Sequence, residues 1–315
     1  MTLEELYKKG TEMLKEADIE NPSVDAFYLL EHAAGLNKTR YLMFKDQQVT
    51  KLNIDQYMKL IERRMTHIPY QYIIGRADFA GLDFEVNSSV LIPRLDTEVL
   101  FEKALRSLGP KAYVLDLCTG SGALGIALKR YRPDIHVVLS DISDAALEVA
   151  KENVVHNHME VAQKTNCAAD PQDLKFGYDL NFNIRVIKSD LFDQMTTDET
   201  DADPSREMVG RFDVIVTNPP YVTEAEYENL MPEVKEHEPK LALTAGEDGL
   251  DIYRRIAKDA PRFLKEDGVM LLEIGCSQAE AVSSLLKEQG FTQIQVIKDL
   301  ADLDRVVICK KPQTV

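Results

Sequence analysis

The stretch Asp116-Leu117-Cys118-Thr119-Gly120-Ser121-Gly122-Ala123-Leu124-Gly125 decides the fold class of this chain. Strand-forming residues, Tyr113–Leu117, lead into it and helix-forming residues follow it. Three glycines at G-x-G-x-x-G spacing let the chain turn tightly, let a ligand approach bare backbone and let the helix pack closely on the strand. This context predicts a nucleotide-type cofactor site. The motif alone does not choose among NAD, FAD and S-adenosylmethionine.

Carboxylates stand at the ends of the next two predicted strands. Asp141 follows Gly120 by 21 positions, where a carboxylate is placed to accept hydrogen bonds from both ribose hydroxyls. Asp190 ends the third strand and is suited to accept from an adenine amino group, with Leu191 covering the ring. The alternative is that both are helix caps or polar strand ends. Three strand ends around one glycine loop favour the cofactor site.

Strands and helices alternate from about Leu95 onward. The expected strands are Tyr113–Leu117, Val137–Ser140, Arg185–Lys188, Phe212–Thr217, Val269–Ile274, Ile294–Ile297 and Arg305–Cys309. Helical patterns, such as Ala145–Asn153 and Asp251–Lys265, lie between the first five. This predicts an α/β fold with a doubly wound, mostly parallel, seven-stranded sheet. The last two strands are too close in sequence for a crossover helix, so we expect them to pair antiparallel at one edge.

The N-terminal part has a different pattern. Residues 1–68 have helical spacing, with one helix predicted from Asn21-Pro22-Ser23 to Gly35. In residues 69–94, β-rich runs at 71–74 and 90–92 predict a hairpin linker. We therefore expect a small helical domain (1–68), the linker (69–94) and a catalytic domain (95–315). Residues 156–183 and 196–210 are interpreted as surface insertions.

The fourth strand runs into Asn218-Pro219-Pro220-Tyr221. With S-adenosylmethionine as the cofactor, this motif is suited to methyl transfer onto an amide nitrogen. Such a nitrogen is a poor nucleophile, so the reaction requires acceptors that hold its N–H bonds. We expect the Asn218 side-chain oxygen and the Pro219 carbonyl to be these acceptors. Two prolines fix the backbone, and Tyr221 is suited to stack on a planar amide or base. The alternative, a turn after a strand, does not explain the preceding loop and carboxylates.

Three further stretches carry a family resemblance. They are Pro69–Gly75, Leu91–Glu98 and Glu238–Leu243 together with Gly246–Leu250. With the Asn218–Tyr221 motif, they make the chain resemble the HemK/PrmC family of protein-(glutamine-N5) methyltransferases over almost its whole length. The resemblance implies methyl transfer from S-adenosylmethionine to the glutamine of the Gly-Gly-Gln motif in class I peptide chain release factors.

The resemblance also implies roles for particular residues. The helical domain would help to hold the release factor. The cofactor-binding set would be Cys118, Thr119, Gly120, Ser121, Gly122, Asp141, Asp190, Leu191 and Asn218. The substrate glutamine would contact Asn218, Pro219, Pro220 and Tyr221. The departures from the family pattern are Cys118, where many relatives have glycine, and the two insertions.

Composition limits the other functions. Asp and Glu number 53 against 37 Lys and Arg, a formal charge of -16, which disfavours a broad nucleic-acid-binding surface. An adenine or guanine amino methyltransferase remains the alternative, because it shares Asn218–Tyr221. An oxidoreductase would leave that motif unexplained, and a non-catalytic adaptor would not need it.

The remaining signals concern location, metals and partners. The four cysteines are dispersed and form no C-x-x-C pair, which indicates free thiols in a reducing compartment. We expect a cytoplasmic monomer with no metal, no membrane contact and no direct nucleic-acid contact. His156, His158 and the run Glu236-His237-Glu238 lack the further ligands that a metal site needs.

Overall fold

The computed structural model describes residues 1–159, 184–195 and 208–312. The chain forms two compact units. The smaller comprises residues 1–76 and 230–238, and the larger comprises residues 77–229 and 239–315. Most of the two predicted insertions, 156–183 and 196–210, lies outside the described residues. Among the described residues, no helix has the length and apolar character needed to span a membrane.

The smaller unit is a helical bundle. Its helices are α1 (Leu3–Glu16), α2 (Pro22–Ala34), α3 (Lys38–Phe44), α4 (Lys51–Arg64), α5 (Tyr70–Ile74) and α10 (Pro232–Lys235). A capping box between Thr2 and Glu5 starts α1. The predicted α2 is confirmed, and Gly35 ends it in the left-handed conformation at φ 61°. Apolar side chains from α1, α2 and α4 form one buried core.

The predicted strand at 71–74 is wrong, because these residues form α5. Pro69 stands at the N-cap, and Gly75 closes the turn with φ 77°. Ile73 is buried in the helical core. One helical turn therefore buries this apolar run in that core, which a strand at a sheet edge would not do. Residues 90–92 also form no strand. The hairpin is β1 (Arg76–Phe79) and β2 (Leu82–Glu85), joined by a two-residue turn.

The larger unit contains a seven-stranded sheet. Its strands are β3 (Tyr113–Leu117), β4 (His136–Asp141), β5 (Ile184–Lys188), β6 (Phe212–Thr217), β7 (Leu264–Glu273), β8 (Thr292–Lys298) and β9 (Asp304–Lys310). The order is β5-β4-β3-β6-β7-β9-β8. The first five are parallel, and β9 pairs antiparallel with both β7 and β8. All seven predicted strands and the antiparallel edge are confirmed.

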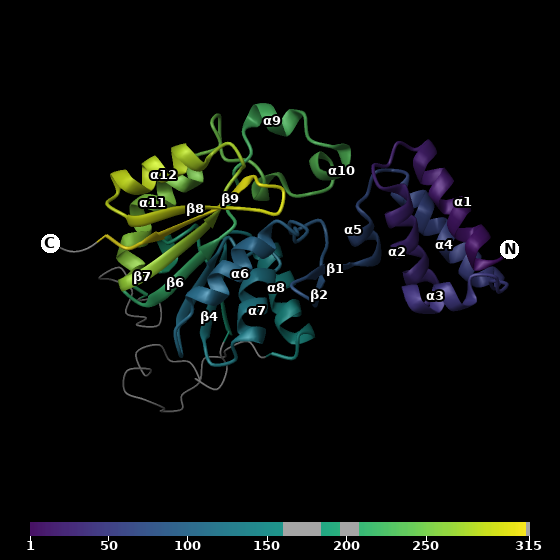
Figure 1. The fold of residues 1–315 in the computed structure, drawn as a ribbon, viewed down its shortest axis with the longest axis horizontal. Coiled ribbons are helices and arrows are strands. Elements are labelled where there is room, and N and C mark those ends of the chain that lie inside the picture. Colours follow the sequence, from purple (N-terminus) through teal and green to yellow (C-terminus); the bar gives the residue numbers. More distant parts are fainter. Residues whose placement is uncertain (160–183, 196–207, 313–315) are drawn as a thin grey trace. The chain divides into compact units, whose positions relative to one another are not determined.

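Helices cover both faces of this sheet (Figure 1). One core joins the sheet to α6 (Thr97–Ser107), α7 (Ala123–Tyr131) and α8 (Asp144–His156). The other joins it to α11 (Asp251–Phe263) and α12 (Ala279–Glu288). Helix α11 ends two residues earlier than predicted, because Leu264 already pairs with Phe212.

The described part of the unit also contains short elements: the 3-10 turns η2 (Asp193–Met195) and η4 (Lys240–Ala242), and helix α9 (Glu224–Glu228). Because β3, β4, β5 and β6 are parallel neighbours, their carboxyl ends meet at one edge of the sheet. Ligands of open α/β sheets bind outside this edge.

Candidate active site

The glycine loop is held from within by Asp116. This side chain is buried and accepts hydrogen bonds from the Thr119 hydroxyl at 2.5 Å and the Gly125 backbone N–H at 2.9 Å. Burial raises the pKa of Asp116 to about 7, and these two hydrogen bonds oppose the rise. Asp116 therefore ties the end of β3 to the first turn of α7.

Close packing and backbone conformation explain the glycine spacing. A Cβ on Gly125 would lie 2.3 Å from the Cδ2 atom of Leu139 on β4, so only glycine lets α7 lie this close to the sheet. Cys118, Gly120 and Gly122 have φ of 60°, 55° and 82°. A Cβ on Gly120 would meet no atom within 4 Å. This glycine is therefore explained by its backbone conformation and by open space beside it.

The Asp141 carboxylate binds the backbone of the glycine loop and also borders the cavity described below. Its carboxylate accepts from the backbone N–H groups of Gly120 at 2.9 Å and Ser143 at 3.0 Å. Burial raises its pKa, and the backbone donors partly offset the effect. With two acceptor positions used by the loop, the carboxylate keeps lone pairs for a ligand hydroxyl.

Asp190 has a cationic partner that the sequence did not reveal. Arg255 of α11 places its Nη2 atom 2.8 Å from an Asp190 carboxylate oxygen. The Asp190 backbone N–H donates to Gln194. Both Asp190 and Arg255 border the cavity described next.

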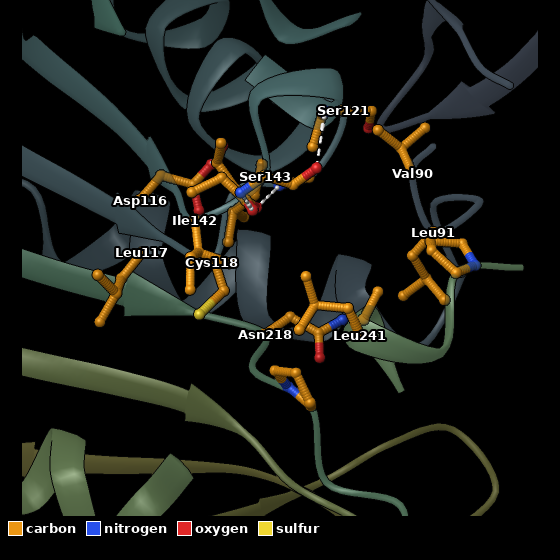
Figure 2. A pocket seen from close by; sticks show the side chains of 18 of the residues that line it. Val90, Leu91, Asp116, Leu117, Cys118, Ser121, Ile142, Ser143, Asn218 and Leu241 are labelled. Carbon is orange, nitrogen blue, oxygen red and sulfur yellow. Dashed lines mark hydrogen bonds between the residues drawn. The ribbon is translucent and has the colours of Figure 1, made fainter. Parts of the chain in front are cut away.

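One cavity of about 250 Å³ lies over these strand ends. Figure 2 shows labelled side chains around a common space, with Ser121 from the glycine loop, Val90 and Leu91 on one side, and Asn218 and Leu241 below. Predicted site residues that line it are Cys118, Thr119, Gly120, Ser121, Asp141, Asp190, Leu191, Asn218 and Pro220. Gly122, Pro219 and Tyr221 are not among its lining residues.

The Asn218 amide is oriented by Thr97, the first residue of α6. Its Nδ2 atom donates to the Thr97 hydroxyl at 3.2 Å, which leaves the Oδ1 atom available as an acceptor. Further along the motif, the Tyr221 N–H donates to the Leu243 carbonyl at 3.1 Å. The Tyr221 hydroxyl lies 3.5 Å from the Glu273 carboxylate, and burial raises the Tyr221 pKa. Its stacking role stays a prediction.

Comparison with known proteins identifies the family. The profile of the PrmC N-terminal domain matches residues 5–75, and that of the methyltransferase small domain matches residues 79–181. The profile of the Eco57I restriction-modification methylase matches residues 136–274. A release factor glutamine methyltransferase from Clostridium acetobutylicum is 34% identical, with 98% of each chain covered. The chain belongs to the release factor glutamine methyltransferase family.

Other relatives agree with this assignment. A release factor glutamine methyltransferase from Geobacter sulfurreducens is 35% identical over 93% of this chain and 91% of its own. Among solved structures, a methyltransferase from Pyrococcus furiosus has a TM-score of 0.50 at 18% identity, covering 80% of this chain and 99% of that one. At that identity the likeness concerns the fold alone. The resemblance inferred from the motifs is thus confirmed at the level of family.

Sequence reasoning missed three residues beside the predicted site: Thr97, Arg255 and Glu273. Thr97 lies inside Leu91–Glu98, a stretch typical of the release factor glutamine methyltransferase family. The sequence therefore marked the stretch that contains Thr97 but did not indicate what Thr97 contacts. Arg255 and Glu273 lie in a regular helix and strand, where no local pattern distinguishes them. Only the tertiary fold brings Arg255 to the cavity and Glu273 to the Tyr221 hydroxyl.

Metal ligation has no support in the described part of the chain, which holds no group of three or more His, Cys, Asp or Glu side chains suited to a metal ion. His156 instead lies 3.0 Å from the Asp83 carboxylate, and His237 lies 3.4 Å from the Thr66 carbonyl. Both imidazoles therefore have structural contacts.

Proposed function

We propose that this protein transfers a methyl group from S-adenosylmethionine to the N5 amide nitrogen of the glutamine in the Gly-Gly-Gln motif of class I peptide chain release factors. The observation that carries the proposal is that Asn218 lines the same cavity as Gly120, Asp141 and Asp190. A reacting amide and a nucleoside-type cofactor would thus meet in one space. Family membership, at 34% identity over nearly the whole chain, supports the same reaction.

The lining residues suit S-adenosylmethionine. A carboxylate, Asp141, stands at the end of β4, as ribose hydroxyls require. Asp190 offers a second carboxylate, and Ile142 and Leu191 add apolar surface for a planar base. The open space beside Gly120 admits a ligand against bare backbone. When bound, this cofactor supplies a methyl group on a positively charged sulfur.

The chain's own contribution is to hold the amide nitrogen. The lone pair of an amide nitrogen is delocalised into its carbonyl, so the nitrogen reacts only when positive charge on it is stabilised. We propose that Asn218 Oδ1 accepts one N–H of the glutamine side chain and the Pro219 carbonyl accepts the other. The nitrogen loses one proton to water after methylation, so no buried general base is required.

The prolines and Tyr221 complete the proposed substrate contact. Pro219 and Pro220 restrict the backbone and provide no N–H donor that would compete for the Asn218 oxygen. Tyr221 would stack on the planar amide. Residues 1–68 would contribute to release-factor recognition, 69–94 would link the domains, and 95–315 would perform the reaction. We propose that the protein acts as a cytoplasmic monomer without direct contact to nucleic acid.

Mass spectrometry of a class I release factor tests the proposal. The factor is incubated with the protein and S-adenosylmethionine, and the peptide containing Gly-Gly-Gln is read. We expect one added methyl group on that glutamine, and Asn218→Ala should lower the rate by about 10²–10³ while leaving cofactor affinity nearly unchanged. If the protein binds the cofactor but does not methylate this glutamine, the proposed substrate is wrong. An amino group in nucleic acid would then be favoured as the substrate.

A further inference from the structure

Three loops of the larger unit meet beside the end of the Asn218–Tyr221 motif. The first continues β6 through that motif, the second contains Gly249, and the third leads from β7 through Gly275 into α12. Gln278, the N-cap residue of α12, lies where they meet. A Cβ on Gly249 would lie 2.4 Å from the Tyr221 carbonyl oxygen. A Cβ on Gly275 would lie 2.9 Å from Gln278 Oε1, so glycine at both positions permits the close approach.

Backbone groups of all three loops bind the Gln278 side-chain amide. Its Nε2 atom donates to the Tyr221 carbonyl at 3.0 Å and to the Gly249 carbonyl at 3.3 Å. Its Oε1 atom accepts from the Gly275 backbone N–H at 3.0 Å. A primary amide has two N–H donors at one end and an oxygen acceptor at the other. Because a flipped amide would set its oxygen against two carbonyl oxygens, these partners permit a single orientation.

The backbone of Tyr221 is consequently held at both of its polar groups. Its N–H donates to the Leu243 carbonyl at 3.1 Å, and its carbonyl accepts from Gln278. At the other end of the motif, the chain is held by Thr217, the last residue of β6. Between these two anchors lie two prolines, whose rings fix φ. The direction of the Pro219 carbonyl therefore depends on where the Tyr221 backbone is held.

We propose that Gln278 is a positioning residue for methyl transfer, which holds the Tyr221 backbone and thereby aims the Pro219 carbonyl at the substrate amide. This inference rests on the proposed function, in which that carbonyl accepts an N–H of the glutamine side chain. Gln278 lies outside the set of residues that line the cavity, so it acts through Tyr221 and not by contact with a ligand. A displacement of about 1 Å at a reacting group can cost about a hundredfold in rate.

The first experiment compares Gln278→Met with Gln278→Glu in release-factor methylation. Methionine keeps the length of the side chain but has no donor, and a glutamate carboxylate would set an acceptor against two carbonyl oxygens. The kcat per cofactor-binding site should fall by roughly ten- to hundredfold in both variants, with the larger loss for glutamate. Kd for S-adenosylmethionine and KM for the release factor should stay within about twofold. Gln295→Met, the same change at an exposed position on β8, should leave turnover unchanged.

Counting the binding sites by cofactor titration separates positioning from a loss of folded protein. A purely structural role would lower the number of sites but leave kcat per site at the wild-type value. A role that depends on shape alone would leave Gln278→Glu, which is nearly isosteric, close to the wild type. Wild-type kcat per site in either Gln278 variant would therefore overturn the inference.

The second experiment perturbs the same contact from another loop and keeps the inference testable if the Gln278 variants fold poorly. Gly249→Ala would place a Cβ 2.4 Å from the Tyr221 carbonyl oxygen and 2.8 Å from Gln278 Nε2, so kcat per site should fall by roughly tenfold or more. Gly210→Ala is the control, because Gly210 has a similar φ, 66° against 71° for Gly249. A Cβ on Gly210 would meet no described atom within 4 Å, so this variant should keep the wild-type kcat per site.

The outcomes separate this inference from the proposed function. Equal kcat per site in Gly249→Ala and Gly210→Ala would show that the contact at Tyr221 does not affect turnover, and the inference would be wrong. Failure of the wild-type protein to methylate the release factor would instead overturn the proposed function.

Discussion

A single carboxylate, Asp141, holds the glycine loop and also lines the cavity at one strand end. It accepts the backbone N–H groups of Gly120 and Ser143, so it orders the glycine loop before any ligand arrives. A carboxylate with both of its oxygens already oriented pays little entropy to receive further hydroxyl donors. The predicted ribose contact and the observed loop contacts are therefore compatible.

Asp141→Ala should weaken cofactor binding by about tenfold or more, because hydrogen bonds to a charged group contribute roughly 1.5–3 kcal/mol. Isothermal titration calorimetry with S-adenosylmethionine measures the change. Asp267→Ala, at an exposed position on β7, is the control and should bind like the wild type. Wild-type affinity in Asp141→Ala would refute the role of this carboxylate.

Cys118 occupies a backbone conformation that favours glycine. Its φ is 60°, which costs a residue with a Cβ about 1–2 kcal/mol, while glycine loses about 0.5–1 kcal/mol through its freer unfolded chain. Cys118→Gly should therefore stay within about 1 kcal/mol of the wild type and bind cofactor normally. The glycine that the family resemblance implies at this position is therefore compatible with the same loop.

Cys118→Val supplies the contrasting variant. A β-branched residue tolerates positive φ least, so this change should lower the thermal midpoint clearly and weaken cofactor binding. Differential scanning calorimetry and cofactor titration of both variants measure the effects. A valine variant as stable as the glycine variant would contradict the assigned strain.

At the scale of elements, an ion cluster joins two helices of the smaller unit to a distant segment. Arg64 of α4 bonds Asp25 of α2 through Nε at 2.6 Å and Glu233 of α10 through Nη2 at 3.1 Å. Arg64 and Asp25 are nearly inaccessible to solvent. Burial raises the Asp25 pKa, and Arg64 opposes this rise. The cluster thus holds residues 230–238 on the helices.

Removing the cation should destabilise the protein strongly. Arg64→Met leaves Asp25 buried without its partner, which typically costs about 3–5 kcal/mol. Arg63→Met, one residue earlier on the same helix and exposed, should cost far less. Urea unfolding followed by circular dichroism compares them, and equal midpoints would show that the cluster adds no stability. The loss from Arg64→Met should shrink at acidic pH, where Asp25 can take up a proton.

The elements also explain where sequence reasoning succeeded and failed. Buried parallel strands such as β3 and β6 are continuous apolar runs ended by polar residues, so Tyr113–Leu117 and Phe212–Thr217 were predicted to the residue. The run 71–74 has strand-forming residues, but the caps at Pro69 and Gly75 and burial in a helical core override that preference. The contacts of Asn218 with Thr97, 121 positions earlier, depend on tertiary packing that no local pattern contains.

At the scale of the whole molecule, buried carboxyl groups dominate the pH dependence of stability near neutrality. Burial raises the pKa of Asp116 and of Glu273 to about 7 from ordinary values of 3.8 and 4.5. Around Glu273, the hydroxyls of Thr97 and Tyr221 and the positive charge of Arg305 oppose the rise, while Asp96 adds to it. Between about pH 4 and pH 7 the native state therefore holds protons that the unfolded state has released.

Stability should consequently fall as pH rises from about 4 to about 7, because the unfolded state binds fewer protons than the native state in this interval. Above about pH 7 both states have released these protons, so the stability should level off. The lowered pKa values of Asp134, Asp248 and Asp299 have the opposite sign, but their contribution is lost only below about pH 4. The formal charge of -16 at pH 7 acts in the same direction as the buried groups, because added protons reduce self-repulsion.

The urea midpoint should therefore be higher at pH 5.5 than at pH 7.5, with an unchanged dependence on urea concentration. The double variant Asp116→Asn and Glu273→Gln replaces these two titrating groups by neutral ones of similar shape, so the difference between the two pH values should shrink to the part that overall charge and the raised pKa values of Asp25 and Asp141 contribute. A wild-type midpoint that is equal or lower at pH 5.5 would mean that these two carboxyl groups remain ionised in the folded protein. In that case their neighbours would have to supply more charge stabilisation than Thr97, Thr119 and Arg305 provide.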